Sequence, residues 1–278
     1  MPELPEVETV RRGLVARVVG RRIERVEVGR ERTVRRTSRQ HLIDGLSGTT
    51  ITAAGRQGKY LVCSLDSGDA LMIHLRMSGQ LLLAPAGAAR PAHTHVALDL
   101  GDDELWFVDP RTFGEMVVFD PDHAATQVPE LARLGIDAVS PELTRAMLAG
   151  LIDRRRQLKA LLLDQHVIAG LGNIYTDEVL HRARLHPLRT GDGVTGREAG
   201  RLHEAIGTVL GEAIAAGGST LADAQYVDLM GGGGSYQDDH RVYGRAGLPC
   251  PTCGRGEIRR LTVGGRSTHL CTRCQPYR

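Results

Sequence analysis

The chain has 278 residues, 41% hydrophobic and 24% charged, so it can bury the core of one large domain or, as we expect, of two. No apolar run reaches the ~18 residues of a membrane helix, and the acidic N-terminus lacks the basic lead of a signal peptide. Nothing in the sequence therefore suggests a membrane-bound or exported protein, and we expect a cytoplasmic protein.

The net charge of +2 conceals two basic ends, because residues 1–40 hold 11 Arg against 6 acids and residues 241–278 hold 8 Arg against one acid. Together these ends would form a positive surface for a polyanion such as nucleic acid, although solvated arginine-rich helices explain the pattern equally well. Of the 35 basic residues 33 are Arg, and Lys59 and Lys159 are the remaining two. Under a general preference for Arg, the two lysines mark places that need a compact ammonium, with chance survival as the alternative.

The N-terminal stretch MPELPEVETV predicts a helix that starts close to the chain end. Pro5 suits the first helical position, and Glu6 and Glu8 complement the positive end of the helix dipole. The buried stripe consists of Val7, Val10, Leu14 and Val18. This helix leaves Pro2 and Glu3 unexplained, while for Glu8 we assign only the capping role.

Between residues 23 and 119 short β-type runs recur at a spacing of about ten residues, which favours an antiparallel sandwich or barrel. These runs are Ile23–Val28, Tyr60–Leu65, Leu71–Met77, Val96–Leu100, Leu105–Val108 and Met116–Phe119. Cys63 is interpreted as a buried core thiol. His93 and His95 share one strand face and can start a metal site, but no third ligand is evident, so a DNA-facing or structural pair is favoured.

After residues 121–141 the pattern becomes helical. The expected helices are Glu142–Gly150, Asp153–Gln165, Ile174–Ala183 and Gly196–Ala216. Residues 157–180, QLKALLLDQHVIAGLGNIYTDEVL, predict a helix, a double turn with Gly170 and Gly172 at the bends, and a second helix from Asn173. Asn173 can cap that helix, or the exposed amides of the turn can hold a phosphate.

The C-terminal part contains a glycine-rich segment and a cysteine pattern. Residues 217–236 are too rich in glycine for a regular element, and we expect a mobile loop there. Two CxxC knuckles follow, separated by 17 residues, which is the spacing of a zinc ribbon around a β-hairpin with Gly264-Gly265. The expected ligands of one structural Zn²⁺ are Cys250, Cys253, Cys271 and Cys274. Disulfides are the less favoured alternative in a cytosolic chain.

These motifs occur in an order that resembles the bacterial formamidopyrimidine-DNA glycosylases, relatives of endonuclease VIII. They are PELPE at the tip, GKYL at 58–61, HLRMSG at 74–79, DPRTFG at 109–114, the LKALLLDQHVIAGLGNIYTDE block and the terminal ribbon. The resemblance covers the whole chain and implies an α+β fold. Its expected domains are an antiparallel β-sandwich with flanking helices (1–130), a helix-two-turns-helix domain with a glycine-rich lesion loop (131–236) and a zinc finger (237–278). Double-stranded DNA containing oxidised bases is the implied partner of a nucleoid-associated bacterial protein that we expect to be monomeric.

The resemblance implies a bifunctional enzyme of base excision repair that removes oxidised purines, namely 8-oxoguanine and formamidopyrimidines, and cuts the strand by β,δ-elimination. A small residue after Met1 favours removal of the initiator, which would expose the Pro2 amine as the nucleophile. A terminal amine titrates near 8 and a Lys near 10.4, so on the order of 10²-fold more free base is present at neutral pH. Glu3 corresponds to the acid–base residue, Glu6 to a supporting carboxylate, and Lys59 to a residue that assists the chemistry and contacts phosphates.

The same resemblance implies the DNA contacts. Met77 would fill the space of the extruded base, Phe113 would wedge beside its partner, and Arg111 would address the pairing edge of that partner. The remaining contacts, mainly to phosphates, are expected from His74, His93, Lys159, Asn173 and Arg266.

Three features depart from the family pattern. Arg76 stands where HLGMSG usually has Gly, Thr112 stands at a usually basic position, and the ribbon is one residue longer between its knuckles. The alternatives are an oxidised-pyrimidine glycosylase like endonuclease VIII, a non-catalytic zinc-containing DNA-binding protein and a zinc-ribbon assembly module. Pro2 and Glu3 favour the enzyme, and the Met77, Arg111 and Phe113 set favours oxidised purines.

Overall fold

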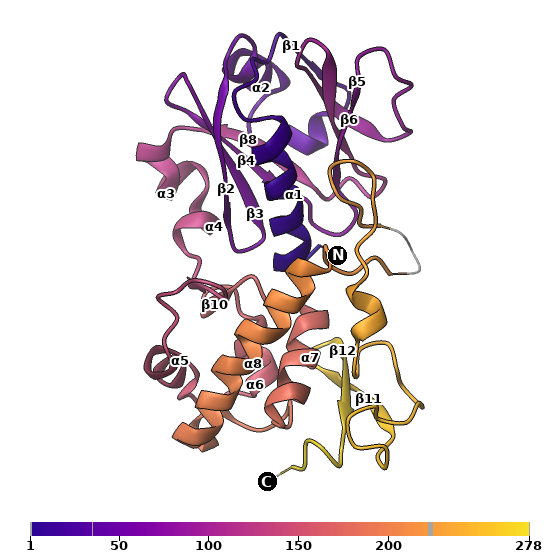
Figure 1. The fold of residues 1–278 in the computed structure, drawn as a ribbon. Coiled ribbons are helices and arrows are strands. Elements are labelled where there is room, and N and C mark those ends of the chain that lie inside the picture. The colour runs from indigo at the N-terminus through magenta and orange to yellow at the C-terminus, as the bar shows by residue number, and fades with distance from the viewer. Residues whose placement is uncertain (1, 35, 222–224, 278) are drawn as a thin grey trace. The chain divides into compact units, whose positions relative to one another are not determined.

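The computed structural model describes residues 2–34, 36–221 and 225–277, and the chain divides into two compact units (Figure 1). The first unit consists of Met1–Arg133 and Ala216–Gln237, and the second of Leu134–Ala215 and Asp238–Arg278. This division differs from the three expected domains, because the glycine-rich segment groups with the first unit and the ribbon with the second. Residues 222–224 of that segment lie outside the described residues.

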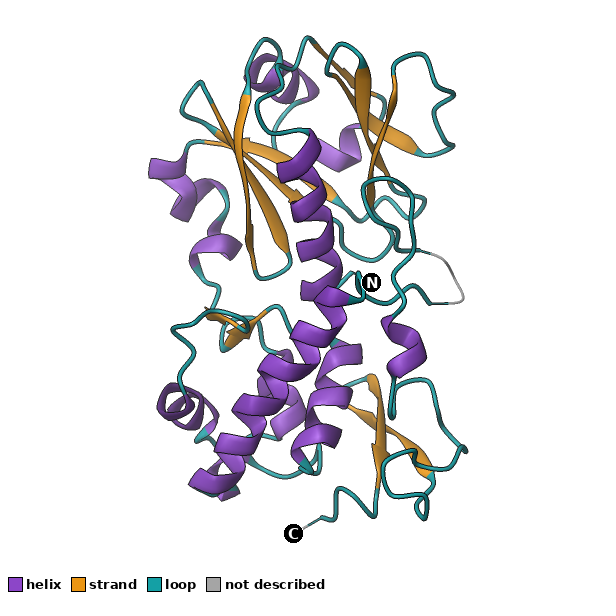
Figure 2. Ribbon diagram, viewed as in Figure 1, coloured by secondary structure: helices purple, strands orange, loops and turns teal. Residues whose placement is uncertain are grey.

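The first unit is built on two four-stranded antiparallel sheets, with strand orders β1-β6-β7-β5 and β2-β3-β4-β8 (Figure 2). Their strands are β1 (Arg25–Val28), β2 (Ile51–Gln57), β3 (Tyr60–Leu65), β4 (Ala70–His74), β5 (Gln80–Pro85), β6 (Thr94–Asp99), β7 (Asp103–Val108) and β8 (Glu115–Phe119). The expected antiparallel sandwich is therefore confirmed. The sequence missed two edge strands, β2 and β5. In β2, ITAAGRQ carries small and polar residues where an apolar alternation would identify a strand.

Helices and short 3₁₀ turns flank these sheets. They are α1 (Leu4–Arg17), η1 (Glu31–Val34), α2 (Arg39–Leu46), η2 (Pro121–His123), α3 (Ala124–Gln127) and α4 (Pro129–Ala132). Helix α1 buries its expected apolar stripe in the sandwich core. A Cβ at Gly13 of α1 would lie 2.9 Å from Cβ of Leu229, so the helix and the glycine-rich segment are in close contact.

The second unit contains most of the remaining helices and a small hairpin. Its elements are β9 (Ile136–Asp137), α5 (Arg145–Ile152), α6 (Leu158–Leu163), β10 (Ile168–Ala169), α7 (Asn173–Ala183), η3 (Gly191–Gly193), α8 (Gly196–Ala215), β11 (Ile258–Val263) and β12 (Arg266–Cys271), and η4 (Tyr236–Asp239) spans the unit boundary. Gly264 and Gly265 form the turn between β11 and β12 with φ of 55° and 75°, the left-handed values of a two-residue hairpin turn. Among the described residues, we find no helix long and apolar enough to cross a lipid bilayer.

Helix α6 starts later than the sequence predicts, at Leu158 in place of Asp153. Tertiary hydrogen bonds fix this start, because the N–H groups of Leu158 and Lys159 donate to the carbonyls of Arg189 and Pro187 at 2.8 and 3.1 Å. The apolar periodicity alone could not reveal that boundary.

Glu8 in α1 is part of an ionic cluster. Its carboxylate lies 2.8 Å from Arg11 and 3.0 Å from Arg12 on the same helix, and 3.3 Å from Arg56 on β2. Burial by itself raises the pKa of Glu8, but the hydrogen bonds from Arg11 and Arg12, with the charge of Arg56, outweigh it and lower the pKa to about 2. The structure thus gives Glu8 a role in attaching α1 to β2.

We expect Glu8→Gln to lower the free energy of unfolding by about 1–2 kcal/mol at pH 7. The folded pKa of Glu8 is about 2, below the unfolded value of about 4.3. The stabilisation by Glu8 is therefore complete above pH ~4.3 and is lost as the pH falls toward 2. Denaturant titrations of both proteins at several pH values should show curves that converge in acid. Glu24→Gln, at an exposed pair 3.8 Å from Arg22, is the control and should change little. A difference between Glu8→Gln and the original protein that is constant with pH would contradict the ionic explanation.

Candidate active site and nucleic-acid interface

The start of α1 holds two buried carboxylates next to Pro2. Glu3 is the N-cap residue, with extended backbone, and Pro5 occupies the first turn. The Glu6 carboxylate accepts the Glu3 N–H at 2.8 Å, and the Glu3 side chain accepts from the backbone of Glu6 in return, which forms a capping box. Glu3 and Glu6 are each only 1% exposed. The amine expected at Pro2 is therefore followed by an acidic segment whose backbone is fixed.

Glu6 also binds the glycine-rich segment. Its second oxygen accepts the Ser219 N–H at 2.7 Å, across 213 positions of sequence. Gly218 has a left-handed φ of +83°, and a Cβ there would lie 2.7 Å from the Glu6 carboxylate. The Tyr226 hydroxyl donates to the Gly217 carbonyl at 2.9 Å, and burial, reinforced by the charge of Glu6, raises the pKa of Tyr226, so the phenol keeps the proton it donates.

The segment expected to be mobile thus makes defined contacts in its described residues. Beyond Glu6, the Leu83 N–H on β5 donates to the Leu229 carbonyl at 2.9 Å, and the Gln80 side chain donates to the Gln225 carbonyl at 3.2 Å. Sequence reasoning missed Ser219 and Tyr226. The Gly217-Gly218 pair was the available signal, since a close approach of backbone to another group is a common reason for glycine.

Lys59 follows Gly58 in the turn between β2 and β3. Gly58 has a left-handed φ of 56°, and Lys59 is 8% exposed. The next residue, Tyr60, pairs with His74 across β3 and β4, and the two rings meet edge to face at 4.3 Å between centroids. Both residues expected to contact DNA near the chemistry, Lys59 and His74, therefore lie at the same end of one sheet.

Arg76 keeps the backbone conformation that glycine would adopt. Its φ is 55°, and its N–H donates to Nδ1 of His74 at 2.9 Å, which leaves Nε2 of a neutral His74 as the protonated nitrogen. The Arg76 guanidinium lies 3.9 Å from Glu115, which is fully buried and also binds Arg36 at 2.6 Å. The left-handed turn before Met77 is therefore retained despite the substitution, and an ion pair accompanies it.

Asp109 joins the two loops that carry the expected base contacts. Its fully buried carboxylate accepts the Ser78 hydroxyl at 2.6 Å and the N–H groups of Gly114 and Arg111 at 2.7 and 3.2 Å. Ser78 follows Met77, so one side chain fixes both loops. The sequence contained Asp109 and Ser78 in separate motifs, but no local pattern connects them.

The base-contact residues themselves are accessible. Arg111 is exposed, Phe113 is 40% exposed, and Met77 is partly buried. The Arg111 guanidinium lies 5.0 Å from the centre of the Phe113 ring, a cation–π contact. Thr112 between them is buried with a left-handed φ of 55°, so the loop turns the side chains on either side of it outward.

The two histidines of the HTH stretch have different environments. His95 is 5% exposed, and its Nε2 lies 2.8 Å from the Asp109 carbonyl, so it supports the loop. His93 is exposed with a left-handed φ of 66°. In the described part of the chain, the group able to hold a metal is the four-cysteine cluster, and neither histidine belongs to it.

In the second unit, the environment of Lys159 does not match the DNA contact that we expected for it. It is 0% exposed, and its ammonium binds Asp177 at 2.6 Å and the Ser267 carbonyl at 2.9 Å. The structure therefore places Lys159 in a buried ion pair, which differs from the phosphate contact that we expected. Asn173 at the start of α7 donates to the same Ser267 carbonyl at 2.9 Å. Two side chains thus fix the residue next to the exposed Arg266.

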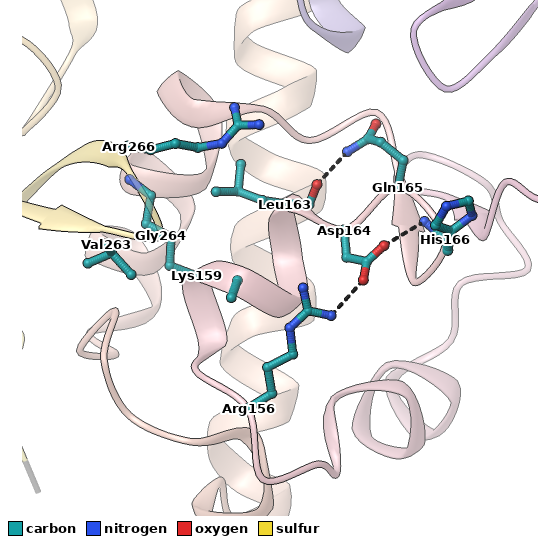
Figure 3. A pocket seen from close by; sticks show the side chains of 10 residues that line it. Arg156, Lys159, Leu163, Asp164, Gln165, His166, Val263, Gly264 and Arg266 are labelled. Atoms are coloured by element: carbon teal, nitrogen blue, oxygen red, sulfur yellow. Dashed lines mark hydrogen bonds and ion pairs between the residues drawn. The ribbon is translucent and has the colours of Figure 1, made fainter. Parts of the chain in front are cut away.

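A hollow of about 440 Å³ lies between α6 with its following turn and the β11–β12 hairpin (Figure 3). Arg156 and the His166 N–H both bind the Asp164 carboxylate, at 2.6 and 3.0 Å, and Arg266 lies on another side of the hollow. Burial raises the pKa of Asp164, but the Arg156 hydrogen bond and its other partners lower it overall, so this carboxylate stays ionised. Among the described residues that line the hollow, Arg266 at the hairpin turn is an arginine for which no ion pair is seen.

The four cysteines of the ribbon fit a zinc ion. Their sulfurs lie within 4.8 Å of one another, with 3.8 Å between Cys250 and Cys274 and 3.8 Å between Cys253 and Cys271. A tetrahedron with Zn–S bonds of ~2.3 Å has edges of about 3.8 Å. A disulfide would need about 2.05 Å, and all four cysteines are free thiols.

Comparison with known proteins gives a consistent match. Residues 1–116 match the formamidopyrimidine-DNA glycosylase N-terminal domain, 134–225 the formamidopyrimidine-DNA glycosylase H2TH domain, and 247–276 the zinc finger found in FPG and IleRS. A protein from Salinispora arenicola named formamidopyrimidine-DNA glycosylase is 48% identical to this chain, over 99% of this chain and 96% of that protein. A protein of the same name from Heliobacterium modesticaldum is 45% identical, over 99% of this chain and 100% of that protein.

Solved structures agree with these relatives. One is the complex of Lactococcus lactis Fpg with DNA that contains an abasic site. Its protein chain is 35% identical to this chain and superposes with a TM-score of 0.91, and the match covers 99% of this chain and 100% of that chain. The complex of the same protein with DNA containing N7-benzyl-Fapy-dG gives the same four values.

The contact between Gly218 and Glu6 can be tested with a matched pair of substitutions. Gly217→Ala and Gly218→Ala both place alanine at a left-handed φ, +72° and +83°, which costs roughly 1–2 kcal/mol. A Cβ at Gly217 has its nearest neighbour at 3.7 Å, whereas at Gly218 it displaces Glu6. We expect Gly218→Ala to lower the unfolding free energy by at least about 1 kcal/mol more, through the lost hydrogen bonds of a buried carboxylate.

Hydrogen exchange locates the effect. In Gly218→Ala the Glu3 and Ser219 amides should exchange faster, because both donate to Glu6, while Gly217→Ala should leave them protected. Equal protection in the two variants would show that Glu6 does not hold these segments together.

Proposed function

The chain belongs to the formamidopyrimidine-DNA glycosylase family, and on that basis we propose that it is a bifunctional DNA glycosylase/AP lyase that excises oxidised purines from duplex DNA. The observation that carries this proposal is the Pro2-Glu3-Glu6 start of α1, held by buried hydrogen bonds in a chain that matches such enzymes over 99% of its length. DNA complexes of the Lactococcus lactis protein with a formamidopyrimidine lesion and with an abasic site support both halves of the activity. We further propose that the protein acts on the bacterial chromosome in the cytoplasm.

Pro2 is the proposed nucleophile once Met1 is removed. Its secondary amine attacks C1′ of the damaged nucleotide, the glycosidic bond breaks, and the base leaves with a proton. The C1′–O4′ bond then breaks as O4′ takes up a proton, which opens the sugar ring and leaves an iminium between Pro2 and C1′. This iminium is cationic at every pH and acts as the electron sink when the C2′ proton is removed. The 3′ phosphate then leaves by β-elimination and the 5′ phosphate by δ-elimination.

Glu3 is proposed to protonate the sugar ring oxygen and to move protons during elimination. Its backbone N–H is held by Glu6 at 2.8 Å, so the position of the acid relative to the amine is set before DNA binds. Lys59, in the β2–β3 turn, is proposed to contact the phosphates that flank the lesion. Because Glu6 binds Ser219 as well, it supports both the catalytic end and the segment proposed to face the lesion.

The duplex is proposed to be held by phosphate contacts and opened by three side chains. His74, His93, Asn173 and Arg266 are the proposed positioning contacts. Met77 fills the vacated space, Phe113 wedges beside the orphaned partner, and Arg111 addresses its pairing edge, which offsets the few kcal/mol lost on flipping a base. Lys159 contributes by fixing the Ser267 carbonyl next to Arg266.

The nucleophile can be identified by trapping. Borohydride should reduce the iminium to a stable protein–DNA link, and peptide mapping should place that link at the mature N-terminal Pro2. Glu3→Gln should reduce base excision by at least about 10²-fold, the usual share of a general acid, while duplex affinity changes little because phosphates dominate binding. A link at Lys59 would overturn the assignment of the amine.

Arg111 gives a prediction about the base opposite the lesion. A guanidinium has only donors, and cytosine offers the adjacent acceptors N3 and O2, whereas adenine places an amino group beside its acceptor. A bidentate contact discriminates by about 1–3 kcal/mol, roughly 5- to 150-fold, so 8-oxoguanine should be excised faster opposite cytosine than opposite adenine. Arg111→Ala should narrow that ratio and spare lyase activity on abasic DNA.

Single-turnover kinetics on the two duplexes decide this point. Arg17→Ala, at the exposed last turn of α1, is the matched control and should keep the ratio. If Arg111→Ala slows both duplexes by the same factor, Arg111 binds a phosphate and does not address the partner base.

A further inference from the structure

One face of α7 contacts the zinc ribbon at successive turns. Asn173, Asp177 and His181 are spaced by four residues and therefore lie on the same side of the helix. Asn173 donates to the Ser267 carbonyl at 2.9 Å, and Asp177 accepts the His269 N–H at 2.8 Å. At the third position, Nε2 of His181 lies 3.6 Å from Sγ of Cys250.

Cys250 differs from Cys253 in its hydrogen-bond donors. Sγ of Cys253 accepts the Gly256 N–H at 3.3 Å. The N–H of Cys250 itself donates to the Gly256 carbonyl. In the described residues, the donor available to the Cys250 sulfur beyond the other cysteines is His181.

The apolar surroundings of the Cys250 sulfur make a hydrogen-bond donor to it important. Cys250 is 0% exposed and packs with Val242 and Ile258, which are also fully buried and apolar. Four thiolates around one Zn²⁺ retain net negative charge, and a buried charge without hydrogen bonds is costly. An N–H directed at this sulfur disperses that charge where water cannot.

His181 lies outside the group of four mutually close ligand atoms, which already supplies the four ligands of a closed structural zinc site. We propose that His181 is a positioning residue that donates an Nε2–H hydrogen bond to the zinc-bound Cys250 thiolate. This bond couples zinc affinity to the packing of α7 against the hairpin that carries Arg266. The inference concerns the metal site alone and can be tested without DNA.

The test compares His181→Leu with His181→Gln in the full-length zinc protein. Leucine removes the donor, whereas the Gln side-chain amide can place an N–H near the position of Nε2. Zinc transfer to a chromogenic chelator should show roughly 10- to 100-fold weaker binding in His181→Leu and a change of only a few fold in His181→Gln. His186→Leu is the matched control, because His186 is buried in the same unit but bonds the Leu188 N–H, and it should retain zinc.

Cobalt substitution gives a second readout that does not depend on stability. The Co²⁺-loaded original protein should show four-sulfur coordination, and loss of the hydrogen bond should shift the thiolate-to-cobalt charge-transfer band to lower energy in His181→Leu but not in His181→Gln. If His181→Leu does not fold, the spectrum of the original protein and the His181→Gln variant still test the proposal. Zinc affinity of His181→Leu within twofold of the original, equal losses in Leu and Gln, or three-sulfur-one-nitrogen coordination would each overturn it.

Discussion

The first unit depends on the Glu6 carboxylate. A buried carboxylate must be hydrogen-bonded to be tolerated, and its two acceptors are satisfied by the Glu3 N–H at the chain start and the Ser219 N–H far along the sequence. These hydrogen bonds also restrict the residue at position 218, because Gly218 must lack a side chain for Ser219 to reach Glu6. One side chain therefore bonds both the proposed catalytic end and the glycine-rich segment, and a change in the conformation of either would break a buried hydrogen bond to Glu6.

The second unit also depends on a buried polar group whose hydrogen bonds must be satisfied. Lys159 and Asp177 form a fully buried pair, and such a pair is stable only when its remaining donors and acceptors are used. The Ser267 carbonyl and the His269 N–H provide them, so the ion pair fixes the register of the hairpin on α7. Lys159, one of two lysines in the sequence, is thus the buried cation of this pair.

The loops that carry Met77 and Arg111 keep their backbone conformation although Arg76 and Thr112 depart from the family pattern. Arg76 and Thr112 both adopt left-handed backbone, which costs roughly 1–2 kcal/mol for a residue with a Cβ. Buried hydrogen bonds on Asp109 from Ser78, Arg111 and Gly114 hold the surrounding chain in place. The loop geometry is therefore imposed by a polar centre, and the residues at the turns can vary.

The sequence by itself determined what is local. Knuckle spacing gave the zinc ligands, apolar periodicity located β3 and α7, and the motif order gave the family and its α+β fold. Only the tertiary structure decided which buried polar groups meet: Glu6 with Ser219, Ser78 with Asp109, Lys159 with Asp177, and His181 with Cys250. Each pair joins segments that no period or turn signal relates. A buried donor or acceptor must find a partner, but which partner it finds depends on how the whole chain packs.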